Sequence, residues 1–570
     1  MEHVFSSIRN CGSKIKVWGI LFLFAWFFTL PFWLGDGVYI FGHDTDYHLA
    51  SIIGMSKVSF SEMFNIKILD TICGGLGYGE GIFYPQFSHV LPAIILKIGE
   101  PFGMTVYIAS MVASFLILFL SGVVVYRLFM LLKKNCRGGL IAAILYMGAT
   151  YGLSDILVRD ARAESAVFLF VPIIGIALYY LAYEQYRKFL PIFVAGCVGL
   201  VNSHLVMTMY VAFFFLVFVT INWKRFISAR KVSFVILGGV LSTIICLPFF
   251  VPLLQNILNT DYVAFSNNYM SNRDFGLIST NSYFNPLAND NRIVWALNIP
   301  AILLCIYVLA TRKEVAKNSF VVSLLVIIGL SMIIQSFISL REAPEFIKMI
   351  QFPWRLNLVI CFPFALLTGI AVTKTGNTSI EKTVFGVLCF SAIIYASYVH
   401  SFTVKVDKTI ENITAETQTY ADYIPLSSYD NLEYLVGRKD KGVIVVDGEA
   451  EIANYSNDIA NMYFSVSVAA DKDVRIEIPR LYYLGYRIKA LYGDGSSEIL
   501  SYSENDKGLI EVGVDRDADI SVYYTGTKAQ IAAEIISVVT CVAIVAIYVV
   551  TGRAKHVLKA FRSAGLGEKH

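Results

Sequence analysis

The sequence predicts a polytopic α-helical membrane protein of about twelve spans that carries an extracytoplasmic all-β sandwich domain. Of the 570 residues, 56% are hydrophobic and only 16% are charged, with a mean hydropathy of +0.62. Soluble domains typically contain about 25% charged residues. Apolar runs of bilayer length, about 17–25 residues, recur along the chain. One long polar region near the C-terminal end is instead rich in short β-branched and aromatic runs, which are typical of strands.

Twelve apolar segments form the predicted membrane module. They lie at residues 17–35, 104–132, 138–154, 165–183, 189–204, 206–222, 232–254, 293–311, 318–339, 351–373, 383–401 and 528–551. Lys and Arg collect on alternate connections, as the positive-inside rule expects of cytoplasmic loops. These connections carry Arg9/Lys14/Lys16, Lys133/Lys134/Arg137, Arg187/Lys188, Lys224/Arg225/Arg230/Lys231, Arg312/Lys313/Lys317 and Lys374/Lys382, and the tail carries Arg553, Lys555, Lys559 and Arg562. We therefore predict a multi-pass protein with both termini in the cytoplasm.

The chain is predicted to divide into three parts. Residues 1–401 form the multi-span catalytic module, 402–526 the extracytoplasmic β sandwich, and 527–570 the final span with a basic cytoplasmic tail. The outward connections of the first part include 36–103, 155–164 and 255–292. Strands are expected at 443–446, 462–468, 474–478, 486–492, 509–512 and 520–524. Asp494-Gly495, between two of these runs, is a hairpin signal.

Two carboxylates and two imidazoles lie within residues 43–48, directly after the first span. Ionisable groups at a membrane face are costly unless they are paired or functional. Asp44 and Asp46 are therefore candidate catalytic residues, because a carboxylate beside a membrane cavity can act as a general base or hold a divalent cation. His43 and His48 could share either role. The alternative is a hydrated loop whose acids merely pair with outward arginines.

A second ionisable group comprises Arg159, Asp160, Arg162 and Glu164 on the next outward connection. Guanidinium groups match phosphate oxygens bidentately, and the interspersed acids could coordinate a metal. The alternative is a helix start stabilised by ion pairs, with Asp155 and Arg159 paired at a spacing of four. The shared outward face with Asp44 favours a functional role.

Other candidates carry weaker signals. Arg355 lies near the start of an apolar span, where it could snorkel outward or bind a lipid phosphate. His204 ends a short span, where a hydrogen-bonded interfacial histidine is the common case. The glycines of residues 74–79 favour close backbone packing over phosphate binding. The charged residues of 341–348 are expected to form a solvated loop.

Five short motifs occur in a set order along the chain. They are Gly42-His43-Asp44 with Tyr47-His48-Leu49, Gly77-Tyr78-Gly79 with Phe83-Tyr84-Pro85, Arg159 with Ala163-Glu164, Gln351-Phe352-Pro353-Trp354-Arg355, and Tyr482-Tyr483-Leu484-Gly485-Tyr486. The arrangement of an early span, an outward acidic motif, many further spans and a second acidic-basic outward loop resembles the GT-C superfamily of integral-membrane glycosyltransferases. More narrowly, the set of motifs resembles the bacterial membrane proteins described as YfhO-like or 6-pyruvoyl-tetrahydropterin-synthase-related. The resemblance covers residues from about 17 to 525, and the pterin label suggests no pterin site here.

The resemblance implies an inverting glycosyltransferase of the bacterial cell membrane with an extracytoplasmic active face. The donor would be a polyprenyl-phosphate sugar, and the acceptor a cell-wall or glycolipid hydroxyl. Asp44 would be the base, although Asp46 is an extra acid that leaves this choice open. The donor phosphate would contact Arg159, Arg162, Arg355 and His204, and the substrate cavity would include His43, His48, Tyr84, Glu164 and Trp354. A divalent cation, Mg or Mn, held by Asp46, Asp160 and Glu164 is a further option.

Two other functions are consistent with parts of the pattern. A transporter or flippase for a lipid-linked polysaccharide would also place arginines near phosphates, but transporters commonly show repeated halves and polar residues at the membrane midplane. A non-catalytic assembly protein could use the sandwich to bind cell-wall sugars. Nucleic acid is not an expected partner, because the basic residues occur only in short clusters between spans.

Overall fold

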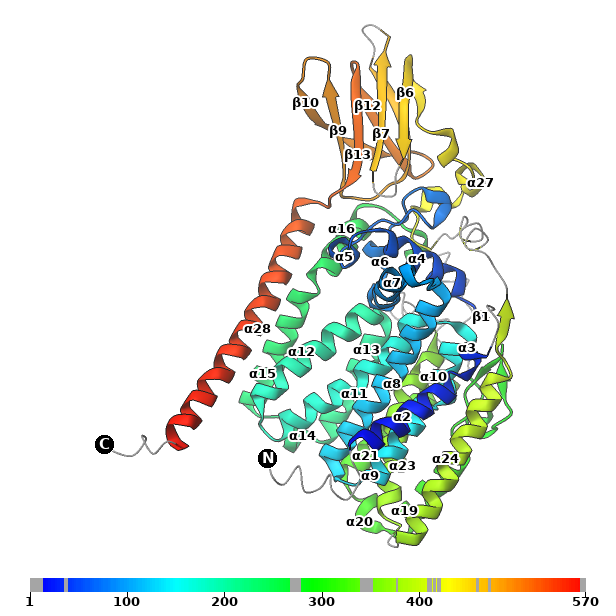
Figure 1. Cartoon of the computed structure of the whole chain (residues 1–570), viewed down its shortest axis with the longest axis vertical. Coiled ribbons are helices and arrows are strands. Elements are labelled where there is room, and N and C mark those ends of the chain that lie inside the picture. The colour runs from blue at the N-terminus through cyan, green and yellow to red at the C-terminus, as the bar shows by residue number, and fades with distance from the viewer. Residues whose placement is uncertain are drawn as a thin grey trace.

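The computed structural model describes residues 14–34, 39–266, 278–338, 352–375, 378–406, 413, 417, 422–457, 461–469 and 473–563. The chain is mostly helical and carries a separate β-rich region towards its C-terminal end (Figure 1). We call the end of the helical bundle that carries the β-rich region the outer end, and the opposite end the inner end. Helix α2 begins, and helix α28 ends, towards the inner end.

Helices coincide with the twelve predicted apolar segments. They are α2 (Lys14–Phe28), α8 (Val106–Lys133), α9 (Cys136–Met147) with α10 (Thr150–Ser154), α11 (Arg162–Ala182), α12 (Tyr186–Ser203), α13 (Leu205–Ile221), α15 (Ala229–Ile245) with α16 (Leu247–Asn259), α19 (Ile299–Thr311), α21 (Ser319–Phe337), α23 (Leu356–Thr373), α24 (Thr378–His400) and α28 (Lys528–Ser563). Among the described residues, six helices are long and apolar enough to cross a membrane, or up to eight if each of two bent pairs is one span. These candidate spans indicate a multi-pass membrane protein.

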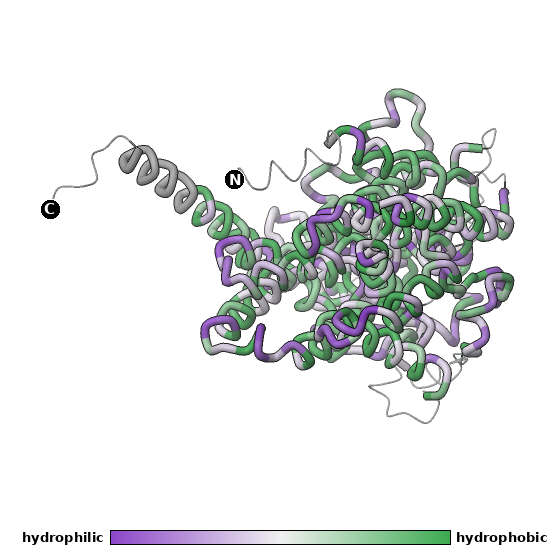
Figure 2. Tube along the Cα trace, turned by 90° about the horizontal axis from the view of Figure 1, so that it is seen from below, coloured by the Kyte–Doolittle hydropathy of each residue, from purple (hydrophilic) through white to green (hydrophobic). Residues whose placement is uncertain are grey.

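Lipid contact explains the surface of this bundle. Large hydrophobic side chains are exposed along several helices, including Phe22 of α2, Phe213 of α13, Phe390 of α24 and Ile547 of α28. Soluble monomers rarely expose contiguous apolar patches of this kind. Seen from the inner end, hydrophobic positions make up much of the helical trace (Figure 2).

Two of the predicted spans are bent rather than straight. Helix α9 meets the following helical segment, which ends at Arg159, at 40°, and α15 meets α16 at 66°. Pro248 lies in the first turn of α16. Because proline lacks an N–H and clashes with the preceding turn, α15 cannot continue through it. The apolar segments predicted at 138–154 and 232–254 each fold as two helices joined at a bend.

The predicted outward loop 36–103 is in fact largely structured. It contains β1 (Tyr39–Phe41), α4 (Thr45–Lys57), α5 (Phe60–Met63), a 3₁₀ turn η1 (Cys73–Gly75), α6 (Glu80–Phe83) and α7 (Phe87–Gly99). Apolar residues such as Ile52 and Leu69 are fully buried in a core shared with the β-rich region. Burial of these side chains stabilises short helices that hydropathy alone does not reveal.

The predicted loop 155–164 is also helical and buried. A π-helical turn, η3 (Asp155–Arg159), follows α10, and α11 begins at Arg162. Of the predicted loop 255–292, residues 267–277 lie outside the described residues, and the rest includes η4 (Val263–Phe265), α18 (Asn281–Phe284) and β2 (Asn289–Asp290). The loop predicted at 341–348 also lies outside the described residues.

The β-rich region consists of two antiparallel sheets, with strand orders β10-β9-β13-β7-β6 and β11-β12-β8-β5. The strands are β5 (Ile444–Asp447), β6 (Ala450–Asn457), β7 (Asn461–Val468), β8 (Val474–Leu481), β9 (Tyr486–Tyr492), β10 (Ser497–Leu500), β11 (Tyr502–Glu504), β12 (Leu509–Val514) and β13 (Ala518–Tyr524). All six predicted strand runs lie on strands, and Asp494-Gly495 does connect the hairpin β9–β10. The polar strands β6, β10 and β11 were not predicted.

Polar and backbone contacts tie the β-rich region to the outer end of the bundle. The Arg480 guanidinium donates to the carbonyl of Gly75 at 2.9 Å, and the backbone N–H of Leu481 donates to the carbonyl of Leu76 at 2.8 Å. Short strand β4 (Val404–Val406), within the predicted sandwich range, pairs instead with β1 beside the candidate site. The outer end is therefore one packed assembly of helices, loops and sheets.

Candidate functional site

The candidate site is built where the segment after β1 packs on the end of η3. A Cβ atom at Gly42 would lie 2.6 Å from the backbone carbonyl carbon of Arg159, so only glycine fits there. The backbone N–H of Asp44 donates to the carbonyl of Arg159 at 3.0 Å. The Thr45 hydroxyl accepts from the N–H of Gly42 at 2.7 Å and donates to Asp160 at 2.9 Å. These contacts place Asp44 directly beside the second ionisable group.

Glu164 is the centre of a buried ion-pair cluster. Its carboxylate accepts two hydrogen bonds from the Arg159 guanidinium, at 2.9 and 3.1 Å, and one from Arg355 Nε at 2.7 Å. The Tyr151 hydroxyl donates to it at 3.0 Å. Arg159 also contacts Asp155 at 2.7 Å. The cluster joins the neighbouring segments η3 and α11 to the start of α23, which is far from them in sequence, and all its charged members are buried.

A second ion pair, between Arg162 and Asp160, lies on the same side of the site. Nη2 of Arg162 lies 2.8 Å from both carboxylate oxygens of Asp160. Asp160 adopts a left-handed backbone conformation, with φ of 56°, where the chain turns from η3 into α11. The interpretation of this segment as a helix start with ion pairs therefore describes its structure, including the predicted pairing of Asp155 with Arg159.

Asp44 differs from the three acids around it. Asp155, Asp160 and Glu164 each form an ion pair with an arginine, whereas Asp44 forms none with any described residue. Burial raises the pKa of Asp44 to about 6, with Arg159 opposing the rise and Glu164 adding to it. A half-buried carboxylate with this pKa can accept a proton near neutral pH.

The structure brings several other predicted residues to the same place. The His43 side chain is exposed at the surface. Partial desolvation of its ring and the positive charges of Arg292 and Arg159 lower its pKa. Asp46 lies in the first turn of α4, where the helix dipole favours a carboxylate, so its position has a structural explanation. His204 caps α13: its Nδ1 accepts from the N–H of Met207 at 3.3 Å, which leaves Nε2 as the donor of a neutral ring.

Aromatic residues pack beside the Glu164 cluster. Trp354 stacks on Phe352 with ring centroids 4.2 Å apart, and its buried Nε1–H has no hydrogen-bond partner among the described residues. Trp295 stacks on Tyr151 at 5.6 Å. An unused indole N–H beside two aromatic planes is suited to a polar ligand with an apolar face.

A buried hydrogen-bonded chain lies behind Asp44, and two of its members were not predicted. Nδ1 of His48 lies 2.6 Å from Nε2 of His89, and Nδ1 of His89 lies 3.0 Å from Glu80. The Tyr47 hydroxyl also donates to Glu80. Burial and the neighbouring His89 lower the pKa of His48 well below its ordinary value, so this ring is neutral. The chain orients His48, one helical turn after Asp44.

Tyr84 belongs to this layer rather than to the ion-pair cluster. Its ring stacks on His89 with centroids 5.5 Å apart and meets Tyr47 edge-on at 5.6 Å. The Asp44 carboxylate is near enough to raise the pKa of the Tyr84 hydroxyl, which burial already places well above its ordinary value. The Gly42–His48 segment and the Phe83-Tyr84-Pro85 motif therefore form one wall of the site.

Arg292 is a further residue that the sequence did not single out. It follows β2 and acts electrostatically on His43. Unlike Arg159, Arg162 and Arg355, it has no carboxylate partner among the described residues. The signal for it was weak, because Arg292 is a lone basic residue between a polar connection and an apolar segment. Its unneutralised charge makes it a candidate anion contact.

The residues present do not fit a divalent cation. Glu164 is shared by two guanidinium groups, and Asp160 is bound by Arg162 and Thr45, so neither offers the free negative charge that Mg²⁺ or Mn²⁺ requires. No group of three or more His, Cys, Asp or Glu side chains suited to a metal occurs in the part of the chain that the structure describes. The metal set Asp46, Asp160 and Glu164 is therefore not supported by this geometry.

No protein-family model matches the chain, and no curated protein matches it either. The resemblance drawn from the five motifs therefore stays a prediction.

Proposed function

We propose that this chain is an inverting glycosyltransferase that uses a polyprenyl-phosphate sugar at the outer face of a bacterial cell membrane. The observation that carries the proposal is Asp44. Unlike Asp155, Asp160 and Glu164, it forms no ion pair with a described arginine, its pKa is raised to about 6, and two buried arginines lie beside it. A base of this kind is what deprotonation of an acceptor hydroxyl requires.

The proposed step is a single displacement. The Asp44 carboxylate takes the proton of the acceptor hydroxyl as its oxygen bonds to the anomeric carbon. The bond between that carbon and the phosphate oxygen breaks, and the electron pair leaves with the polyprenyl phosphate. No general acid is needed, because the phosphate is already a stable anion when it leaves. Attack from the face opposite the phosphate inverts the anomeric configuration.

Arg159 and Arg355 are already paired with carboxylates. They are therefore suited to positioning the donor phosphate, but not to neutralising its charge by themselves. Glu164 holds Arg159 and Arg355 in fixed orientations, and Asp155 further balances Arg159. Fixed dipoles and charges act on a transition state without reorganising. Arg292, beside His43, has no carboxylate partner among the described residues. We therefore propose it as an additional contact of the donor phosphate.

We expect Arg292→Ala to raise KM for the donor by about 10–100-fold, because a charged hydrogen bond to phosphate is lost. Turnover at saturating donor should change much less. Initial rates over a donor concentration series give both values. Arg487→Ala, an exposed arginine on β9, is the control and should leave KM unchanged. An unchanged KM in Arg292→Ala would remove Arg292 from the donor site.

The pH dependence of turnover follows from the pKa of Asp44. Since the base works only when deprotonated, turnover should rise with pH, reach half of its plateau near pH 6, and fall about tenfold for each pH unit below that. Initial rates between pH 4.5 and 8 measure this limb. A profile that is flat down to pH 4.5 would contradict a base with a raised pKa.

The finer features of the fold belong to the same proposal. We propose that the chain crosses the membrane twelve times, through the six long apolar helices, the two bent pairs, the three shorter apolar helices α2, α13 and α19, and α12. Both termini would then be cytoplasmic. The buried faces of the two sheets contribute to one hydrophobic core, which supports a sandwich.

Cleavage of the bond between sugar and phosphate in the donor distinguishes a glycosyltransferase from a transporter or an assembly protein. Purified protein in vesicles receives a polyprenyl-phosphate sugar labelled in both the sugar and the lipid. The proposal expects released polyprenyl phosphate and a sugar joined to the acceptor. Movement of intact donor across the bilayer, or binding without bond cleavage, would favour the alternatives and overturn it.

A further inference from the structure

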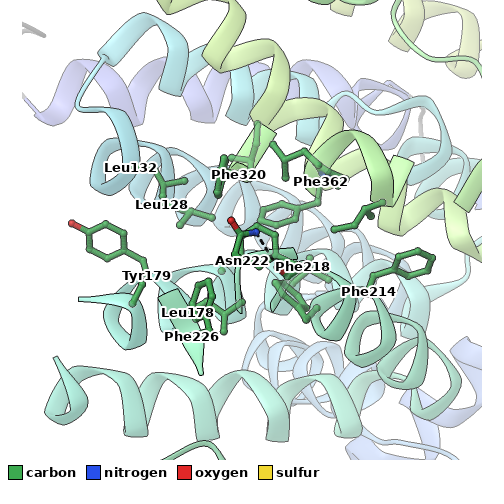
Figure 3. A pocket seen from close by; sticks show the side chains of 18 of the residues that line it. Leu128, Leu132, Leu178, Tyr179, Phe214, Phe218, Asn222, Phe226, Phe320 and Phe362 are labelled. Carbon is green, nitrogen blue, oxygen red and sulfur yellow. Dashed lines mark hydrogen bonds between the residues drawn. The ribbon is translucent and has the colours of Figure 1, made fainter. Parts of the chain in front are cut away.

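A large apolar cavity lies at the inner half of the bundle, away from the candidate site. It measures about 310 Å³ and is lined mainly by residues of α8, α11, α13, α21 and α23 (Figure 3). Its wall is mainly aliphatic and aromatic, and includes Leu128, Val171, Phe214, Phe218, Leu324 and Phe362. A cavity of this size is typical of small-molecule sites.

The cavity wall offers water few hydrogen-bonding groups. Asn222 is its buried amide, and both of its N–H groups are used: Nδ2 donates to the carbonyl of Phe218 at 2.9 Å and to the Ser323 hydroxyl at 3.2 Å. Apolar cavities exclude water and accept hydrocarbon ligands. A hydrocarbon chain is therefore the chemistry that this wall accommodates.

The charged lining residues all lie towards the inner end. Lys133 ends α8, and Arg225 lies in α14 (Trp223–Phe226) directly after α13. Both side chains are exposed, and neither has a carboxylate partner among the described residues. The Arg225 guanidinium lies 5.7 Å from the ring centroid of Tyr183, which also lines the cavity. Lys374 adds a third positive charge close enough to Lys133 to repel it.

An apolar cavity with an uncompensated basic mouth is complementary to an anionic lipid. We propose that one hydrocarbon chain of an anionic phospholipid occupies this cavity from the inner, cytoplasmic leaflet, with its phosphate contacting Lys133 and Arg225. Lys and Arg at a membrane face attract anionic headgroups. The polyprenyl chain of a donor is the less suitable occupant, because the proposed donor phosphate site is at the outer end and the basic mouth is at the inner end.

Lipid selectivity of the full-length protein tests this proposal. Protein in detergent is titrated with phosphatidylglycerol or phosphatidylcholine of identical chains, and bound lipid is counted by native mass spectrometry. We expect phosphatidylglycerol to bind about tenfold more tightly or better, because its headgroup has a net negative charge that two cations attract, whereas the choline of phosphatidylcholine neutralises its phosphate. Lys133→Gln with Arg225→Gln should abolish the preference, and Leu324→Trp should weaken binding of both lipids by filling the cavity.

The control variant removes the same number of positive charges at positions that do not line the cavity. Lys224→Gln with Arg230→Gln removes two cations from the same end, and neither residue lines the cavity. This pair should retain the preference for phosphatidylglycerol. Equal affinity for the two lipids in the unmodified protein, or an undiminished preference in Lys133→Gln/Arg225→Gln, would overturn the proposal. The proposal would also be overturned if a polyprenyl phosphate displaced phosphatidylglycerol equally well from the unmodified protein and from Lys133→Gln/Arg225→Gln.

Discussion

Asp44→Asn is expected to lower the rate of sugar transfer by about 10²–10⁴-fold while leaving the fold intact. The variant keeps the shape of the side chain but removes the group that accepts the proton. No described side chain forms an ion pair with Asp44, so no ion pair is lost with the charge. Release of polyprenyl phosphate by purified protein measures the rate, and the thermal unfolding midpoint in the same detergent measures the fold.

Asp46→Asn is the matched control, with the same chemical change two residues further on. Because Asp46 lies in the first turn of α4, its loss should affect helix stability slightly and transfer by much less than tenfold. A large loss in Asp46→Asn with little effect in Asp44→Asn would move the base to Asp46. Full activity in both variants would exclude an acid from this segment as the base.

Glu164→Gln is expected to reduce the free energy of unfolding by about 3–5 kcal/mol, the largest stability effect at the site. The change removes the carboxylate that Arg159 and Arg355 share, so that Arg159 keeps Asp155 as its counter-ion, and removing the counter-ion of a buried guanidinium is strongly unfavourable. Equilibrium unfolding in denaturant, followed by circular dichroism in detergent, measures the loss.

The partly exposed pair Arg137–Glu381 is the control for this prediction. Its atoms approach to 3.1 Å, but the Arg137 side chain is 36% exposed, so water screens the interaction. Glu381→Gln should cost less than about 1 kcal/mol. A Glu164→Gln protein as stable as Glu381→Gln would show that the Glu164 cluster is hydrated and does not hold α11 and α23 together.

Hydropathy was sufficient to locate the long apolar helices, because lipid-facing and buried helices of this kind both need long apolar runs. It could not predict the bend between α15 and α16, since helix continuity depends on local geometry around Pro248. It also missed α4 and α7, whose apolar residues are stabilised by packing on the β-rich region. Strands β6 and β10 were missed because both are largely exposed and polar, without the alternation that marks β9.

The candidate site was also only partly predictable from the sequence. Outward position was enough to group Asp44, Arg159, Glu164 and Arg355, which the structure does bring together. The ion pairs could not be predicted from the sequence: Arg159, Arg162 and Arg355 are each bound to a carboxylate. Glu80 and His89 were missed because each looks like an isolated polar residue until α6 and α7 place it beside α4.

The pH profile of transfer, recorded for the unmodified protein and for Asp44→Asn in one membrane preparation, tests whether Asp44 is the base. In the unmodified protein we expect turnover to fall below about pH 6. The residual activity of Asp44→Asn should lack this fall, because the group that titrates has gone. A fall near pH 6 that persists in Asp44→Asn would show that another residue is the base.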